Sequence, residues 1–250
     1  MSRVVFGLNP VLELLRTDAA KVSELILAQG RGQARLKEIL SLARAAGVKV
    51  RRRPRQELDR LTGSRAHQGL AALTADFAYL ALADLLDRPR LDLVVILDGI
   101  QDPRNLGSIA RTSLAAGAQG LIIPKDRAAK VTPTALKASA GALNHLPVIR
   151  VTNLNQTARQ LKEAGLWLLG GSPQAETSLF DLPDLPPRLA VIIGAEGRGL
   201  GRALAQKCDF LAALDLAGPL ESLGASAAAA AILFEIVRQK RKITSNSAQS

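Results

Sequence analysis

The chain has 250 residues, with 33 Lys and Arg against 22 Asp and Glu, which gives a formal net charge of +11. Hydrophobic residues make up 48% and charged residues 22%, so the composition excludes a wholly disordered chain and favours one large or two small globular domains. The single cysteine excludes an intrachain disulfide framework, and with only two histidines no metal centre is expected. No apolar run is long enough for a transmembrane helix, and no signal-peptide pattern is present. We therefore expect a cytoplasmic protein with an anionic partner and no membrane association.

Most of the positive charge lies in the first third of the chain. Residues 1–75 hold 14 Lys and Arg against 6 Asp and Glu, a net of +8, whereas residues 76–250 hold 19 against 16. The densest run is Arg51-Arg52-Arg53-Pro54-Arg55. Such clusters favour contact with nucleic-acid phosphates, and a solvated strand or loop face is the alternative. Because aromatic residues are only 3% of the chain, recognition by charge and shape is favoured over base stacking.

The first 75 residues alternate between strand-like and helix-like patterns. Asn9 and Pro10 form a typical helix start, and apolar residues at helical spacing predict a second helix that stops before Gly47. The predicted elements of this part are a short entry at 4–7, strands at 23–27, 48–52 and 69–74, and helices at 9–15, 33–46 and 56–61. Residues 1–75 are thus predicted to form a small α/β unit. Residues 76–90 are predicted to be a linker with one helical turn at 82–86.

A different pattern begins at Leu91, where the apolar run 93–97 is typical of a strand buried on both faces. The predicted strands that follow are 93–97, 120–123, 146–150, 166–169, 189–193 and 210–216, and the predicted helices are 106–116, 132–139, 154–164 and 224–239. Alternating strands and helices predict parallel βαβ units in a doubly wound α/β domain over 91–242. The polar tail 243–250 is predicted to be disordered.

Three polar, glycine-rich loops follow predicted strands, at the edge where open α/β sheets bind ligands. The first begins at Asp98 and enters a helix that Asn105 can cap. The second, 194–201, has four glycines around Glu196, and the third, 214–226, is longer than an ordinary connection. The glycine loop lacks the ending of a phosphate-binding P-loop and the position of a dinucleotide fingerprint. The first and third loops also have purely structural alternatives, namely a capped helix with a solvent-facing Arg and the start of a closely packed Ala-rich helix.

Taken together, the three loops resemble the SpoU (TrmH) branch of the SPOUT methyltransferases, which transfer a methyl group from S-adenosyl-L-methionine to a ribose 2′-hydroxyl of RNA. The matching positions are Asp102-Pro103-x-Asn105-x-Gly107-x-x-x-Arg111-Thr112, Gly194-x-Glu196-Gly197-x-Gly199 and Leu214-x-Leu216-x-Gly218-x-x-x-Ser222-Leu223. In the N-terminal part, Gly7-Leu8-Asn9-Pro10-Val11 and His67-Gln68-Gly69 resemble the two ends of the substrate domain of RlmB-type enzymes. The resemblance therefore covers nearly the whole chain.

This resemblance implies a fold class, a cofactor and partners. The implied fold is α/β, with a trefoil-knotted SPOUT catalytic domain and a small N-terminal L30e-like substrate-binding domain. The cofactor would be S-adenosyl-L-methionine, the substrate ribosomal RNA, and the assembly a homodimer with the active site beside the dimer interface. The residues expected to bind the cofactor are Gly194, Gly197, Leu214, Leu216 and Leu223. Those expected to bind RNA are Arg51, Arg52, Arg53 and Arg55.

The resemblance also implies that Arg111, Asn105, Glu196 and Ser222 are catalytic. A ribose hydroxyl is a poor nucleophile at neutral pH, so the site has to orient it and assist its deprotonation. By resemblance Arg111 is the base. Because a guanidinium normally stays protonated, the alternative is that Arg111 grips the adjacent phosphate and stabilises the developing alkoxide.

One position departs from the family pattern, since Gly224 stands where the third motif normally has Asn. Glycine is a tolerated N-cap, so the fold should survive, while the missing amide predicts weaker catalysis or a substitute group. The resemblance implies 2′-O-methylation of a ribose, that of a guanosine, in 23S ribosomal RNA. The alternatives are a tRNA ribose methyltransferase, a ribosome-methylating resistance enzyme, and a catalytically weakened RNA-binding ribosome-assembly factor. His67 and His145 are expected to be structural, and Trp167 to lie in the core.

Overall fold

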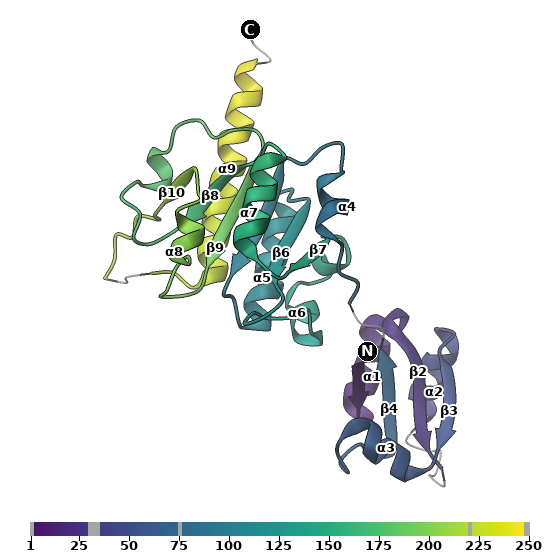
Figure 1. Ribbon diagram of the computed structural model, residues 1–250. Helices are drawn as coiled ribbons and strands as arrows, with labels where there is room; N and C mark the ends of the chain where they lie inside the picture. Colours follow the sequence, from purple (N-terminus) through teal and green to yellow (C-terminus); the bar gives the residue numbers. More distant parts are fainter. Residues whose placement is uncertain (1–2, 30–35, 75–76, 220–221, 248–250) are drawn as a thin grey trace. The chain divides into compact units, whose positions relative to one another are not determined.

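The computed structural model describes residues 3–29, 36–74, 77–219 and 222–247, and it consists of two compact units, 1–77 and 78–250 (Figure 1). Residues 78–90, predicted to be a linker, belong to the second unit. The Leu80 N–H donates to Val148 O at 2.9 Å, and Leu85 of α4 (Leu82–Leu86) is fully buried in the second unit's core. The helical turn predicted at 82–86 is confirmed, while the linker prediction is wrong for 78–90 because leucines at helical spacing give this segment an apolar face to bury.

The first unit is a four-stranded sheet with the order β1-β4-β2-β3. Its elements are β1 (Arg3–Phe6), α1 (Leu8–Asp18), η1 (Ala19–Lys21), β2 (Val22–Ala28), α2 (Lys37–Ala45), β3 (Lys49–Arg53), α3 (Arg55–Thr62) and β4 (Leu70–Thr74). The edge strand β3 is parallel to β2, and the other pairs are antiparallel. Residues 33–35 of the predicted second helix lie outside the described residues. The core forms where Val11, Leu15 and Ile39 of α1 and α2 pack with buried leucines of β2 and β4.

His67 has the structural role that its sequence context predicted. The imidazole is fully buried, its Nε2 lies 3.0 Å from Asp59 Oδ1, and its Nδ1 accepts the Gly69 N–H at 2.9 Å. Both ring nitrogens therefore have partners, and the ring ties the end of α3 to the start of β4.

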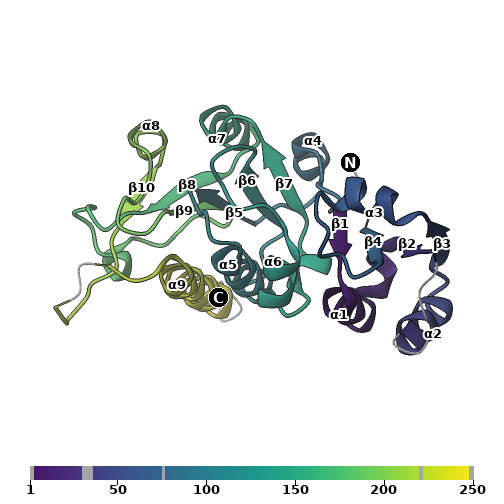
Figure 2. The same ribbon diagram turned by 90° about the horizontal axis from the view of Figure 1, so that it is seen from below.

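The second unit is a six-stranded, wholly parallel sheet with the order β10-β8-β9-β5-β6-β7. Its elements after α4 are β5 (Leu93–Asp98), α5 (Pro103–Ala115), β6 (Gly120–Pro124), α6 (Pro133–Ala138), η3 (Ala142–Asn144), β7 (Val148–Val151), α7 (Leu154–Glu163), β8 (Trp167–Gly171), η4 (Leu179–Asp181), β9 (Leu189–Gly194), α8 (Arg202–Ala205), β10 (Phe210–Ala212) and α9 (Ala225–Ser247). Helices α4, α7 and α8 cover one face and α5, α6 and α9 the other (Figure 2). The predicted doubly wound α/β fold is confirmed, while the trefoil knot stays a prediction.

Three local predictions are wrong. The predicted disordered tail is helical through residue 247, because no Gly or Pro interrupts the chain after the predicted helix end; residues 248–250 lie outside the described residues. Asp102, and not Asn105, caps α5: its Oδ1 accepts the Arg104 N–H at 2.8 Å, and Pro103 occupies the first turn. Trp167 is 47% exposed, since it begins β8 near the sheet edge and its ring lies against Phe210.

Candidate active site

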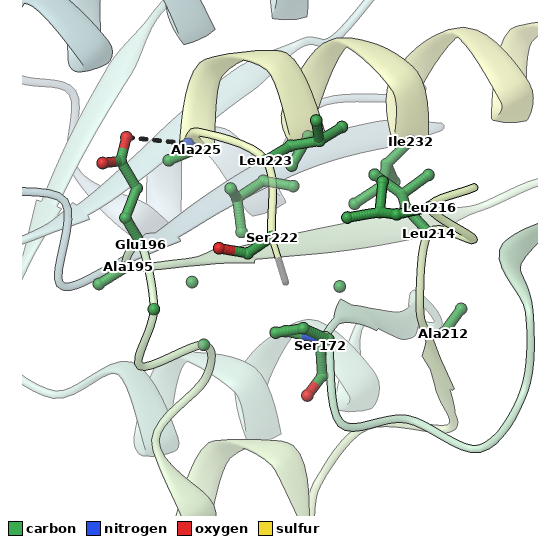
Figure 3. Close-up of a pocket in the computed structure, with 17 residues that line it drawn as sticks. Ser172, Ala195, Glu196, Ala212, Leu214, Leu216, Ser222, Leu223, Ala225 and Ile232 are labelled. Carbon is green, nitrogen blue, oxygen red and sulfur yellow. Dashed lines mark hydrogen bonds between the residues drawn. The ribbon is translucent and has the colours of Figure 1, made fainter. Parts of the chain in front are cut away.

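A cavity of about 180 Å³ opens at the carboxyl ends of β8, β9 and β10, beside the start of α9 (Figure 3). These three strands are neighbours in the sheet, so the loops that follow them converge. The lining residues are Gly171, Ser172 and Pro173 after β8, Ile193 to Gly197 and Gly199 after β9, Ala212, Leu214, Leu216, Ser222 and Leu223 around β10, and Ala225, Ala228 and Ile232 of α9. The site thus forms where an open α/β sheet is expected to hold a ligand.

Contacts that only glycine permits shape the loop after β9. A Cβ on Gly194 would lie 2.3 Å from the carbonyl carbon of Gly199, so any side chain there would force the loop apart. Gly197 and Gly199 have φ angles of +71° and +66°, a region that other residues rarely adopt. The Gly199 N–H donates to Ala195 O at 2.9 Å and closes the turn. The loop therefore presents backbone groups to the cavity.

One carboxylate joins three elements of the site. Glu196 Oε1 accepts a hydrogen bond from Asn105 Nδ2 of α5 at 3.0 Å and another from the N–H of Ala225, the first residue of α9, at 3.0 Å. The first N–H groups of a helix lack intrahelical partners and carry partial positive charge, so a carboxylate is stabilised there. In Figure 3 the Glu196 side chain reaches over the start of α9. All three loops singled out in the sequence are thus tied together at Glu196.

Gly224 is the N-cap of α9, and its carbonyl accepts hydrogen bonds from the Ala227 and Ala228 N–H groups at 2.9 and 3.0 Å. Its φ lies outside the left-handed region, and a Cβ there would be 3.4 Å from Glu196 Oε1, an ordinary contact distance. Neither the backbone nor the available space requires glycine at this position. The Ala225 N–H has a hydrogen-bond partner even without an Asn side chain at position 224, because Glu196 accepts from it.

The cavity has a polar end and an apolar end (Figure 3). The Glu196 carboxylate and the exposed Ser222 hydroxyl lie toward one end, and Leu214, Leu216 and Ile232 gather at the other. Ile232 approaches closely because Gly171 has no side chain; a Cβ there would lie 2.6 Å from Ile232 Cδ1. Such a site suits a ligand that combines an apolar ring with charged groups.

Asp98 holds the glycine loop onto the central strand β5. Its Oδ2 accepts the Gly201 N–H at 2.8 Å, and a Cβ on Gly201 would lie only 3.2 Å from the same oxygen. Asp98 also stands opposite Gly194 in the β5–β9 register. It therefore positions the loop, and it is not among the residues that line the cavity.

Most of the predicted site residues meet at this cavity. All five predicted cofactor contacts line it, as do Glu196 and Ser222, while Asn105 reaches it through its bond to Glu196. Arg111 is not a lining residue; it is exposed on α5, six residues after Asn105. The sequence analysis missed the loop after β8, Gly171-Ser172-Pro173. Its small residues directly after an apolar strand were the signal that could have identified it.

The predicted RNA-binding arginines lie in the first unit, on β3 and at the start of α3. Neighbouring residues of a strand point to opposite faces, and Arg51 and Arg53 share one face. Arg51 pairs with Glu24 and Arg53 with Glu57, at 2.5 and 3.7 Å. Within the described part of the chain, Arg52 and Arg55 are exposed without an ion pair. The charge that this run offers to a partner is therefore smaller than its sequence indicates.

A metal site and a membrane-spanning helix are both absent from the described residues. They contain no group of three or more His, Cys, Asp or Glu side chains arranged to hold a metal ion. They also contain no helix of the length and hydrophobicity needed to cross a bilayer.

Burial raises the pKa of the Cys208 thiol to about 12, with the Asp209 carboxylate adding to the shift, so this thiol stays protonated at neutral pH.

Comparison with known protein families gives two matches that divide the chain much as the structure does. Residues 92–234 match the SpoU rRNA Methylase family, and residues 4–80 match the domain described as RNA 2′-O ribose methyltransferase substrate binding. The first match covers more than half of the chain and contains every residue of the cavity.

Individual proteins agree with the family matches. A protein of Bacillus subtilis (strain 168) described as a TrmH family tRNA/rRNA methyltransferase, YacO, is 39% identical over 243 residues, which are 96% of each chain. The structure is similar to that of an S-adenosyl-L-methionine-bound rRNA methyltransferase from Sinorhizobium meliloti, with 25% identity, a TM-score of 0.65, and coverage of 95% of this chain and 87% of that one. It is also similar to the SpoU methyltransferase AviRb from Streptomyces viridochromogenes in complex with the same cofactor, with 27% identity, a TM-score of 0.63, and coverage of 96% and 91%.

Proposed function

The chain belongs to the SpoU rRNA methylase family and is an S-adenosyl-L-methionine-dependent RNA methyltransferase, and we propose that it methylates the ribose 2′-hydroxyl of a guanosine in 23S ribosomal RNA. The observation that carries the proposal is the pairing of the two units. One holds the Glu196-clasped cavity, and the other matches a substrate-binding domain named for ribose 2′-O-methyltransferases. The S. meliloti structure, named as that of an rRNA methyltransferase, supports ribosomal RNA as the substrate.

The residues of the cavity fit S-adenosyl-L-methionine. Leu214, Leu216 and Ile232 offer an apolar surface for an adenine ring, and the Glu196 carboxylate offers a counter-charge for a cationic ligand. Gly197 has no atom within 4 Å of where its Cβ would be, so a ligand can approach the loop backbone directly. When bound, this cofactor supplies an electrophilic methyl group on its sulfonium. The residues that would hold it are the five predicted ones, Gly194, Gly197, Leu214, Leu216 and Leu223.

The catalytic task left to the protein is to orient a ribose hydroxyl and to assist its deprotonation. Ser222 supplies a hydroxyl at the polar end of the cavity, and Asn105 and Glu196 form a hydrogen-bonded pair beside it. In our proposal Arg111 anchors the phosphate next to the reacting ribose and stabilises the developing alkoxide, because a guanidinium has only donors and α5 leaves it exposed. The base role that the family resemblance implies is the alternative.

Gly224 gives the strongest reason for a different function, an RNA-binding assembly factor without transfer activity. The geometry favours an active enzyme, because Asn105 Nδ2 and the Ala225 N–H both bond to Glu196 without any side chain at position 224. A tRNA substrate is the alternative within the same activity, and the description of the B. subtilis relative as a tRNA/rRNA methyltransferase keeps it open.

The proposed enzyme acts in the cytoplasm as a homodimer. Support for self-association comes from Phe234 of α9 and Phe180 of η4, which are 51% and 56% exposed on elements that pack against each other. Large apolar side chains exposed close together are typical of protein interfaces. Sedimentation velocity of the full chain should give the mass of a dimer, and a monomer at micromolar concentration would contradict this part of the proposal.

The proposed activity is tested by label transfer from methyl-labelled S-adenosyl-L-methionine to unmodified 23S ribosomal RNA, with a tRNA pool in parallel. We expect labelled 23S RNA and, after nucleotide-resolution mapping, one 2′-O-methylguanosine. Label on tRNA alone would establish the tRNA alternative. RNA binding without any transfer would establish the assembly-factor alternative, and a methylated base would overturn the ribose assignment.

A further inference from the structure

Basic residues are unevenly distributed within the second unit. Residues 98–153 contain seven Lys and Arg against three Asp, whereas residues 154–223 contain six against eight Asp and Glu. The basic segment includes the carboxyl ends of β5, β6 and β7 and the loops that follow them. Five of its cations lie at the start of α5, in the loop after β6 or at the end of β7, and we call them the basic rim: Arg104, Lys125, Arg127, Lys130 and Arg150.

Backbone hydrogen bonds join the loops of the rim into one surface. The Ala129 N–H donates to Ile100 O at 2.8 Å, which ties the loop after β6 to the loop after β5. The Lys125 N–H donates to Val151 O at 2.7 Å and ties the same loop to the end of β7. Cations that are spread over 47 positions of the sequence, from 104 to 150, are therefore neighbours along a single sheet edge.

The charge of the rim is available to a partner. Arg104, Lys125, Arg127 and Lys130 are exposed, and in the described ranges of the chain none of them has an ion-pair partner. Several basic residues elsewhere in the same unit are instead paired with close carboxylates. Examples are Arg90 with Asp92, Arg159 with Glu163, and Lys162 with Asp209.

The three aspartates of this segment are outnumbered by its seven cations, and among the described residues none of them forms an ion pair with a rim cation. Asp98 and Asp102 accept backbone N–H groups, from Gly201 and Arg104 respectively, at 2.8 Å each. Asp102 and Asp126 are the exposed carboxylates of the described residues 98–153. The rim is therefore a locally positive surface within a unit whose charge is otherwise nearly balanced.

Two further features hold cations of the rim in place. The Arg150 guanidinium lies over the Tyr79 ring, 5.3 Å from its centre, which is within the range of a cation–π interaction. Arg127 has a φ of +53°, a conformation that non-glycine residues adopt only when their surroundings impose it. The two backbone bonds on either side of Arg127 supply that constraint. The Arg150 side chain and the Arg127 backbone are therefore held in place by their surroundings.

We propose that the basic rim binds the phosphodiester backbone of the substrate RNA beside the nucleotide that enters the cavity. Strand β5 pairs with β9, and Asp98 stands opposite Gly194, so the rim begins one strand away from the glycine loop. A polynucleotide whose ribose lies in the cavity can continue along this edge, where four rim cations are exposed and have no ion-pair partner among the described residues. The inference rests on RNA as the substrate, which is part of the proposed function.

The test compares two triple variants of the full chain that lose the same charge. The rim variant is Lys125→Gln, Arg127→Gln and Lys130→Gln, all exposed and outside the cavity. The control variant is Arg90→Gln, Arg159→Gln and Lys207→Gln, exposed positions that do not follow β5, β6 or β7. Binding to in vitro transcribed 23S ribosomal RNA is measured over a range of salt concentrations, with cofactor affinity by calorimetry and steady-state kinetics in parallel.

We expect the rim variant to bind the transcript about tenfold more weakly at 0.1 M salt and to reduce the slope of log K against log salt by about two units, as for the loss of three phosphate contacts. The KM for RNA should rise, while kcat and cofactor affinity stay within about twofold; the control variant should change none of these. An unchanged slope and KM in the rim variant, or an equal loss in the control, would overturn the inference. Absence of methyl transfer by the unaltered protein would instead contradict the proposed function, and the binding measurement would still decide on the rim.

Discussion

The carboxyl edge of the large sheet carries two surfaces of different character. Over β8, β9 and β10 the cavity depends on close backbone approach, as at Gly194, where a single added methyl group would collide. Over β5, β6 and β7 the basic rim depends on unpaired cations held by loops. Ligand binding at the cavity is thus determined by close steric fit, and ligand binding at the rim by electrostatic attraction. We therefore expect cofactor affinity to depend little on salt but to fall sharply when a methyl group is added to the cavity wall. RNA affinity at the rim should change little with a single substitution but should fall as salt concentration rises.

The largest effect is expected at Gly194. Gly194→Ala places a Cβ within 2.4 Å of two Gly199 backbone atoms, so the loop has to move. Cofactor affinity should fall by at least about 100-fold, in line with the cost of overpacking a rigid site. Isothermal titration calorimetry at 0.05 and 0.5 M salt should give the same loss at both concentrations, with circular dichroism to show that the chain remains folded.

Gly218→Ala is the matched control for this change. Gly218 lies in the loop before α9, its φ is not left-handed, and no atom lies within 4 Å of the position of its Cβ. Its cofactor affinity should stay within about twofold of the unaltered protein, since an exposed site without new contacts gives only small effects. Equal losses in the two variants would mean that the glycine loop does not shape the cavity as described.

A smaller effect is expected at Glu196, which both accepts two hydrogen bonds that join the loops and carries a negative charge. Glu196→Gln keeps an acceptor for Asn105 Nδ2 and the Ala225 N–H but removes the negative charge. If the charge contributes to catalysis, kcat should fall by about 10- to 100-fold with little change in melting temperature. Glu196→Ala removes the acceptor as well and should also lower the melting temperature. Full turnover in the Gln variant would show that Glu196 only joins the loops by hydrogen bonds and that its charge has no catalytic role.

Most residues predicted for the site line the cavity, because they lie in short, continuous segments of the chain. Each of the three loops follows an apolar strand, and the carboxyl ends of parallel strands meet at one edge. The loop after β8, with Gly171 and Ser172, follows the same rule but carries few polar groups and was missed. The helical continuation to residue 247 and the fold of 78–90 onto the second unit depend on local composition and tertiary packing that the patterns did not reveal.

Charge was harder to interpret from the sequence. The run at 51–55 is conspicuous, yet Arg51 and Arg53 are paired with glutamates that lie far along the chain or one helical turn away. The basic rim shows no run longer than Lys125-Asp126-Arg127, and it exists only because the sheet brings three loops together. Net charge per segment indicates the class of partner, whereas the pairing of each cation decides which surface can bind it.

A test of this distinction within the first unit compares Arg52→Gln with Arg51→Gln. Arg52 is exposed without an ion pair among the described residues, while Glu24 neutralises Arg51. Loss of Arg52 should weaken binding to the 23S transcript by about three- to fivefold and reduce the salt slope by less than one unit, as for one phosphate contact. Loss of Arg51 should change affinity by less than about twofold, because its guanidinium is already paired with Glu24 and makes no phosphate contact that would be lost. Equal effects would show that ion pairing does not govern this surface.

The smallest effect is expected at Gly224. Gly224→Asn adds a side chain in ordinary contact with Glu196 at the N-cap of α9, where Asn is at least as favourable as glycine. The free energy of unfolding should rise by a few tenths of a kcal/mol at most, and turnover should stay within about threefold. Thermal unfolding and the label-transfer assay measure the two quantities.

Gly224→Ala separates the added amide from the added bulk, because it places the same Cβ 3.4 Å from Glu196 Oε1 without any hydrogen-bonding group. Both variants should behave alike in turnover if Glu196 alone satisfies the start of α9. A turnover that rises more than tenfold in the Asn variant and not in the Ala variant would show that the unaltered chain lacks a catalytic amide. That outcome would favour the RNA-binding alternative for the unaltered protein, whose cavity would be correctly shaped but would lack the amide group at position 224 that catalysis needs.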